Sequence, residues 1–166
     1  MSETAPDGQA ASGAFSRFTI GGWSVGGFLL HVFSPIFVGA FIYLTWRTTR
    51  LKAFDWFVDW GLKDFIVWLR TTFYGMDESL PEWVLYALPD GLWAYAATAY
   101  FARQWADQNT PWAWGWTLLA PGLGCGGELG QVIGIVPGTF DWWDLGLSAL
   151  GAVLAIYFGR YWPRRG

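Results

Sequence analysis

The sequence predicts an all-α integral membrane protein with about four transmembrane helices and one interfacial amphipathic helix. Hydrophobic residues make up 54% of the 166 residues and charged residues only 14%, against about 25% in a typical soluble domain. Long stretches lack charge, and their length matches the roughly 20 residues that cross a bilayer. The net charge of -3 comes without a basic stripe, which argues against a nucleic-acid partner. The single cysteine, Cys125, excludes an internal disulfide.

Four segments are predicted to span the membrane, within a single polytopic domain of residues 17–166. Residues 26–46 lie in a stretch free of Lys, Arg, Asp and Glu, and residues 145–159 are likewise uncharged. Residues 83–102 contain one charge, and residues 112–134 contain one near their end. Trp and Tyr gather near the predicted span ends, as expected for side chains that favour the headgroup layer.

Residues 51–69 have a different pattern, which predicts a helix lying in the membrane interface. At 100° per residue, Lys52, Asp55, Asp59 and Lys63 fall in one sector, and mostly apolar residues occupy the opposite side. Such a charged stripe would face lipid if the segment crossed the membrane alone. Residues 51–69 are therefore not predicted to be a fifth transmembrane span. A docking surface for a partner protein is the alternative.

The first 16 residues are polar and acidic, and we expect a flexible tail. They contain no Lys or Arg, whereas a secretory signal peptide begins with a basic region. The first hydrophobic segment is therefore expected to be an uncleaved anchor.

Four carboxylates are predicted to meet on one side of the membrane. Asp90 starts the second span, Glu128 ends the third, and Asp141 with Asp144 precedes the fourth. Alternating spans bring these ends together, and Gln131 shares a helix face with Glu128. Helix capping is the alternative for the three aspartates. Glu128 has apolar neighbours, where an unpartnered carboxylate costs several kcal/mol.

Small residues in the third span predict close helix packing. Gly122, Gly126, Gly130 and Gly134 repeat every four residues on one face, and glycines at this spacing allow another helix to approach. We expect Gly126 and Gly130 to face a neighbouring helix.

His31 is the only histidine and lies inside the first span, four residues before Pro35. A buried imidazole can ligate haem or the magnesium of chlorophyll, or it can relay protons. A hydrogen bond to a neighbouring helix is the alternative. Pro35 is expected to kink the span.

The segments PDGLWAYA (89–96), GELGQ (127–131) and PGTFDWWDLGLSALGA (137–152) resemble the VanZ-like family of small bacterial membrane proteins. Residues 83–155 carry this resemblance. It implies a multi-pass protein of the bacterial cytoplasmic (inner) membrane. The residues that match the family pattern are Glu128, Gln131, Asp141, Asp144 and Gly151. The family's usual Lys and His are absent after Asp90, as is its usual Arg before Asp141.

Two functions follow as hypotheses. In the first, Asp90, Glu128, Gln131, Asp141 and Asp144 bind a cation, such as Mg²⁺ or Ca²⁺, or the head group of a lipid or cell-wall precursor. No nucleophile with an adjacent base is visible, so no reaction is assigned. In the second, the protein is a structural subunit of a larger membrane complex, with His31 able to hold a pigment or haem. Membrane lipids are expected partners in both, and other membrane-protein subunits in the second.

Overall fold

The computed structural model describes residues 19–48 and 52–162, which are mostly helical. The predicted tail of residues 1–16 lies outside them. In chain order the elements are β1 (Thr19–Ile20), β2 (Trp23–Ser24), α1 (Val25–Phe28), a π-helical turn (Leu29–Phe33), α2 (Ser34–Trp46), α3 (Lys52–Asp59), α4 (Lys63–Thr72), a 3-10 turn (Met76–Ser79), α5 (Glu82–Tyr86), α6 (Leu88–Gln104), α7 (Pro111–Thr117), α8 (Leu119–Val132) and α9 (Trp142–Tyr161).

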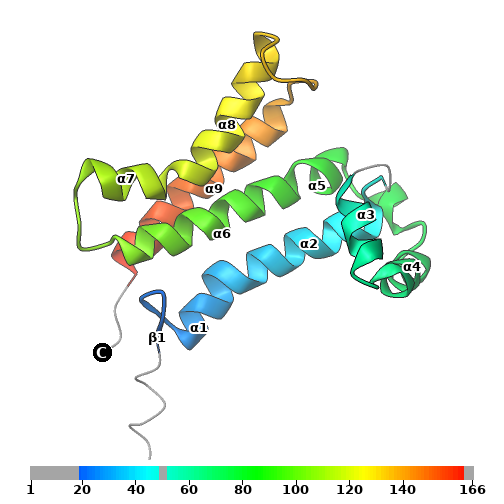
Figure 1. Cartoon of the computed structure of the whole chain (residues 1–166), viewed down its shortest axis with the longest axis horizontal. Helices are drawn as coiled ribbons and strands as arrows, with labels where there is room; N and C mark the ends of the chain where they lie inside the picture. The colour runs from blue at the N-terminus through cyan, green and yellow to red at the C-terminus, as the bar shows by residue number, and fades with distance from the viewer. Residues whose placement is uncertain (1–18, 49–51, 163–166) are drawn as a thin grey trace, which may run out of the picture.

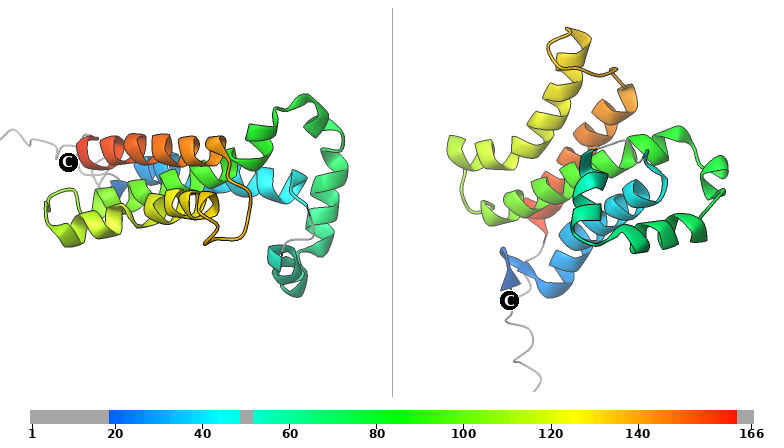
Figure 2. Two further views of the ribbon diagram at one scale, coloured as in Figure 1. Left: turned by 90° about the horizontal axis from the view of Figure 1, so that it is seen from above. Right: turned by 45° about the vertical axis from the view of Figure 1, so that its right-hand side comes forward.

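Helix α6 occupies the centre of the bundle. It packs most extensively against α9, and the two helices run in the same direction. Helices α2 and α8 run the opposite way on either side of α6 (Figure 1). Helices α3 and α4 lie beyond the end of α2 and project from the other helices, as the view from above shows (Figure 2). The direction therefore alternates from α2 to α6, α8 and α9, as the four predicted spans require.

Two helices of the described chain are long and apolar enough to cross a membrane: Val25–Trp46 and Trp142–Tyr161. They correspond to the first and fourth predicted spans. The first contains a π-helical turn immediately before Ser34 and Pro35. A widened turn of this kind accommodates a proline that has no N–H to donate, so the irregularity expected at Pro35 precedes it.

The second and third predicted spans are each two helices, so the expectation of one continuous helix is wrong for both. Residues 83–102 are divided between α5 and α6 at Ala87, and residues 112–134 between α7 and α8 at Leu118. Each break lies two or three residues before a proline, Pro89 or Pro121. Proline removes one backbone donor and crowds the preceding turn.

The predicted amphipathic helix of residues 51–69 is also divided, so a single helix there was wrong. Helices α3 and α4 are separated at Gly61, whose φ of 76° is in the left-handed region. Phe54 and Leu69 are buried against the protein. Arg70 fastens α4 to the end of α2: its Nε donates to the Leu44 carbonyl at 2.9 Å, and Nη2 donates to the Arg47 carbonyl. Burial lowers the pKa of Arg70.

The contact between α6 and α9 depends on glycines of α9. A Cβ on Gly159 would lie 2.6 Å from the Ala102 Cβ and 3.0 Å from the Ala99 carbonyl oxygen. A Cβ on Gly151 would lie 3.0 Å from the Gly91 carbonyl oxygen. Only glycine allows the two backbones to approach so closely.

The glycine repeat of the third span does not form the predicted packing face. A Cβ on Gly126 would meet no atom within 4 Å, and one on Gly130 would meet Val136 in the following loop. Helix α8 instead approaches α9 through Gly124, where a Cβ would lie 3.4 Å from the Ser148 Oγ. The four-residue spacing of glycines identified small residues in α8 but did not predict which face of the helix packs against a neighbour.

A buried arginine joins three segments at the other end of the bundle. Arg103 of α6 is only 5% exposed. Its Nε donates to the Gly22 carbonyl at 2.7 Å, and its Nη1 donates to the Trp162 carbonyl at 2.9 Å. The guanidinium also lies 5.0 Å from the ring of Trp23. Arg103 therefore holds the β1–β2 hairpin and the end of α9 against α6.

Candidate functional site

Three of the four predicted carboxylates line one groove between α6, α8 and α9. The groove has a volume of about 440 Å³. Its polar lining residues are Asp90, Glu128, Asp144 and Ser148. The other lining residues are Trp93, Ala94, Ala97, Ala120, Leu123 and Gly124. The alternating helix directions bring these carboxylates together although they are distant in the sequence. We call this the acidic groove.

Local structure explains where each carboxylate lies. Asp90 follows Pro89 in the first turn of α6. Asp141 caps α9, because its Oδ1 accepts from the Trp143 N–H at 2.8 Å, and Asp144 lies in the first turn. The capping alternative therefore applies to Asp141, whose carboxylate is used by the helix. Asp141 lies beside the acidic groove without lining it.

Glu128 and Gln131 interact with each other and with the start of α9. Glu128 Oε2 accepts from the Asp141 backbone N–H at 3.0 Å, and Oε1 accepts from Gln131 Nε2 at 3.4 Å. The Gln131 amide packs over Gly138, where a Cβ would lie 2.9 Å from it. Gln131 thus supports Glu128 rather than lining the groove.

Several polar atoms of this region have no partner in the described part of the chain. Asp144 Oδ1 and Gln131 Oε1 are buried without a hydrogen bond. Ser148 is only 4% exposed and lines the groove, and its hydroxyl has no hydrogen bond with the described residues. Buried polar groups are nearly always paired, so the two groups that line the groove, the Asp144 carboxylate and the Ser148 hydroxyl, point to a polar ligand or to water there.

Arg47 does not line the acidic groove, but its charge acts on two of the carboxylates, which the sequence pattern did not indicate. It follows α2, and its guanidinium lies 5.0 Å from the ring of Tyr86. Its charge acts on both Asp90 and Asp144, and it reduces the repulsion between the carboxylates. The signal in the sequence was weak, because Arg47 looks like one of several basic residues after a span.

The donor set does not resemble a preformed metal centre. Within residues 19–48 and 52–162 no three His, Cys, Asp or Glu side chains are placed to hold one metal ion. The three carboxylates thus share one groove without forming a compact chelating cage. A single charged group could still neutralise them together.

His31 lies far from the acidic groove, in an aromatic enclosure. Its Nδ1 is 2.6 Å from the Tyr95 hydroxyl on α6. Its ring centroid lies 4.9 Å from that of Trp23, 5.1 Å from that of Phe158 and 5.1 Å from that of Trp162. The imidazole is 5% exposed. The Nδ1 contact is the hydrogen bond to a neighbouring helix that was the alternative, while Nε2 is buried without a partner among the described residues.

Comparison with family models, curated proteins and solved structures found no match to this chain. The resemblance to the VanZ-like family consequently rests on the sequence motifs alone.

Proposed function

We propose that the chain is a multi-pass protein of a bacterial inner membrane in which four segments cross the bilayer. The two long apolar helices support this proposal. Helix α6 packs along α9 and against α2, and α8 packs against α9. If α2 and α9 cross the membrane, α6 and α8 lie at the same depth. The break between α5 and α6 at Ala87, which is fully buried, then keeps its irregular backbone against protein.

In the same proposal α3 and α4 lie in the membrane interface. Four residues of this region are exposed on the protein itself: Asp55, Val58, Lys63 and Phe65. If some of them react more slowly with a water-soluble reagent, lipid rather than protein must cover them. In a variant lacking Cys125, we expect cysteines at 55 and 63 to react with a water-soluble thiol reagent from one side only. Cysteines at 58 and 65 should react much more slowly. Equal rates at all four positions would contradict an interfacial location.

We further propose that the acidic groove binds a positively charged group, either a free cation or the polar head group of a lipid. The observation that carries this proposal is the convergence of Asp90, Glu128 and Asp144 around the unpartnered Ser148 hydroxyl. Arg47 offsets part of the negative charge, and a bound cation would offset more. The attraction is strengthened where the groove excludes water.

The proposal predicts that neutral isosteres weaken cation binding. We expect Glu128→Gln and Asp144→Asn each to weaken binding of ethanolamine, Mg²⁺ or Ca²⁺ by about tenfold, or roughly 1.4 kcal/mol. Binding can be followed by cation-dependent thermal stabilisation in a mild detergent. The double variant should lose less than the sum of the single variants, because the carboxylates act on one ligand.

Two exposed acids of the turn before α5 provide matched controls. Asp77→Asn and Glu78→Gln remove the same charges outside the groove, and we expect them to leave cation binding unchanged. If all four variants lowered binding equally, the effect would come from net charge rather than from the groove. If no cation stabilised the parent protein, the binding proposal would be wrong.

The alternative is a structural subunit of a membrane complex, and one surface favours it. Trp56, Trp60 and Trp68 of the α3–α4 region are 60%, 69% and 57% exposed. Large exposed aromatic side chains suit a protein partner as well as a lipid interface. Native mass spectrometry from mild detergent separates the two functions, since a fixed protein partner or a coloured cofactor would favour the subunit.

A further inference from the structure

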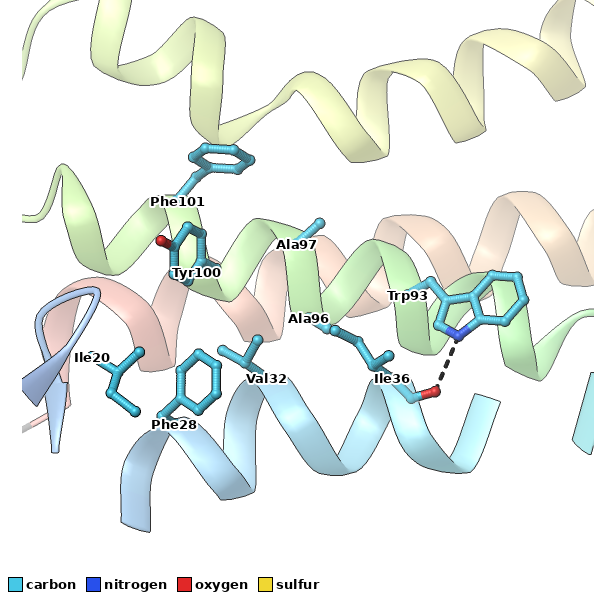
Figure 3. Close-up of a pocket in the computed structure, with 9 residues that line it drawn as sticks. All are labelled: Ile20, Phe28, Val32, Ile36, Trp93, Ala96, Ala97, Tyr100 and Phe101. Atoms are coloured by element: carbon cyan, nitrogen blue, oxygen red, sulfur yellow. Dashed lines mark hydrogen bonds between the residues drawn. The ribbon is translucent and has the colours of Figure 1, made fainter. Parts of the chain in front are cut away.

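One face of α6 continues from the acidic groove into a larger apolar groove. Asp90, Trp93, Ala97 and Tyr100 follow at intervals of three or four residues, so they share a helix face. The apolar groove has a volume of about 660 Å³ and lies between this face and the first span. Its lining residues are Ile20, Phe28, Val32, Ile36, Trp93, Ala96, Ala97, Tyr100 and Phe101 (Figure 3).

Trp93 and Ala97 line both grooves, so the grooves adjoin along α6, and we call the two together the trough. The Trp93 Nε1 donates to the Ile36 carbonyl at 3.3 Å and so fixes the indole between α6 and α2. Three carboxylates lie at one end of the trough, and the other end is lined by apolar and aromatic residues. The trough is therefore amphipathic along its length.

The apolar part is long enough for a hydrocarbon chain and is lined almost wholly by apolar and aromatic side chains. It runs beside residues 28–36 and 93–101, or about 12 Å at the helical rise of 1.5 Å per residue. Trp93 lies where the apolar part meets the polar part.

We propose that this trough binds one amphiphile, a lipid with an amine head group, which rests on the proposed binding of a positive group by the acidic groove. The ammonium group lies among Asp90, Glu128 and Asp144, and its N–H groups donate to the carboxylates and to the Ser148 hydroxyl. The hydrocarbon chain passes over Ala97 into the apolar part. An ammonium is favoured over a phosphate because the groove has three carboxylates, and among the described residues Arg47 is the cation that acts on them.

Photolabelling tests the position of the chain. The protein is placed in phosphatidylcholine nanodiscs with dodecylamine that carries a diazirine on its chain, and with a matched dodecanol probe. We expect the amine probe to label residues 28–36 and 93–101, and unlabelled dodecylamine to compete with it. The alcohol probe should label all lipid-facing surfaces without preference, because it lacks the charge that directs the amine to the carboxylates.

Neighbouring residues of α2 provide a matched pair of variants. Ile36 lines the trough and is 46% exposed, whereas Phe37 is 60% exposed and does not line it. Ile36→Trp should fill the apolar part and reduce specific labelling about tenfold, an overpacking effect of the usual size. Phe37→Trp should leave it unchanged. Asp144→Asn should also reduce specific labelling.

The outcomes distinguish the two proposals. If ethanolamine binds and Asp144→Asn weakens its binding, but dodecylamine labels all apolar surfaces alike, the chain position is wrong and the acidic site stands. Equal losses for Ile36→Trp and Phe37→Trp would likewise overturn the chain position. If amine and alcohol label alike and Asp144→Asn changes nothing in either assay, both proposals are wrong.

Discussion

Replacing Gly159 with alanine should markedly destabilise the protein. The added Cβ would lie 2.6 Å from the Ala102 Cβ, with the Ala99 carbonyl oxygen 3.0 Å away and the Arg103 nitrogen 3.2 Å away. These atoms belong to the α6 backbone or to its Cβ, so they cannot turn aside as a flexible side chain would. We expect a loss of about 1–3 kcal/mol, the usual cost of overpacking, measured as a lower thermal midpoint in mild detergent.

Gly146 on the same helix is the matched control. A Cβ at this position would meet no atom within 4 Å. Gly146→Ala should therefore be neutral or stabilising by up to about 1 kcal/mol, because alanine is the better helix former. A loss of stability as large as that of Gly159→Ala would show that the effect comes from backbone flexibility and not from the α6–α9 contact.

Replacing Arg103 with methionine should produce the second large loss. Two backbone carbonyls, of Gly22 and Trp162, would lose their guanidinium donors, and the contact with the Trp23 ring would also be lost. Leaving a buried acceptor without its donor costs about 1–3 kcal/mol for each group. We expect a lower thermal midpoint together with faster proteolysis at the β1–β2 hairpin, which Arg103 holds against α6.

Two further variants test this interpretation. Lysine at position 103 keeps the charge but has no planar fork to reach both carbonyls, so Arg103→Lys should recover part of the stability. Lys63→Met removes an exposed positive charge and should change stability by less than about 0.5 kcal/mol. Equal effects of Lys63→Met and Arg103→Met would contradict a specific role for Arg103.

Local patterns in the sequence predicted the helical class and the two longest apolar helices. The charge-free stretch of residues 26–46 coincides with Val25–Trp46, and the predicted span of residues 145–159 lies within Trp142–Tyr161. Counting alternating spans also predicted that Asp90, Glu128 and Asp144 would meet, and they line one groove. The length of an apolar segment is read from the sequence itself, and successive spans must alternate in direction. These predictions therefore needed no knowledge of tertiary contacts.

The helix breaks were harder to predict, although their causes are visible in the sequence. A hydropathy pattern does not record a missing backbone donor, so Pro89 and Pro121 were included within single spans. Gly61 likewise separates α3 from α4 because its left-handed conformation suits glycine. These errors leave the order of the helices unchanged but alter where each helix begins.

The tertiary structure alone decided which residues pack and which complete the site. The regular glycine repeat of α8 suggested a packing face, yet Gly159 and Gly151 of α9 make the close approach to α6. The charge of Arg47, which follows α2, acts on Asp90 and Asp144 although it is distant from them in the sequence. Trp93 lines both the acidic and the apolar groove. The sequence by itself determined which segments are helical and apolar, because those properties are local. The rotation of each helix about its axis depends on all its neighbours at once, and this rotation decided which glycines pack and which residues line the two adjoining grooves.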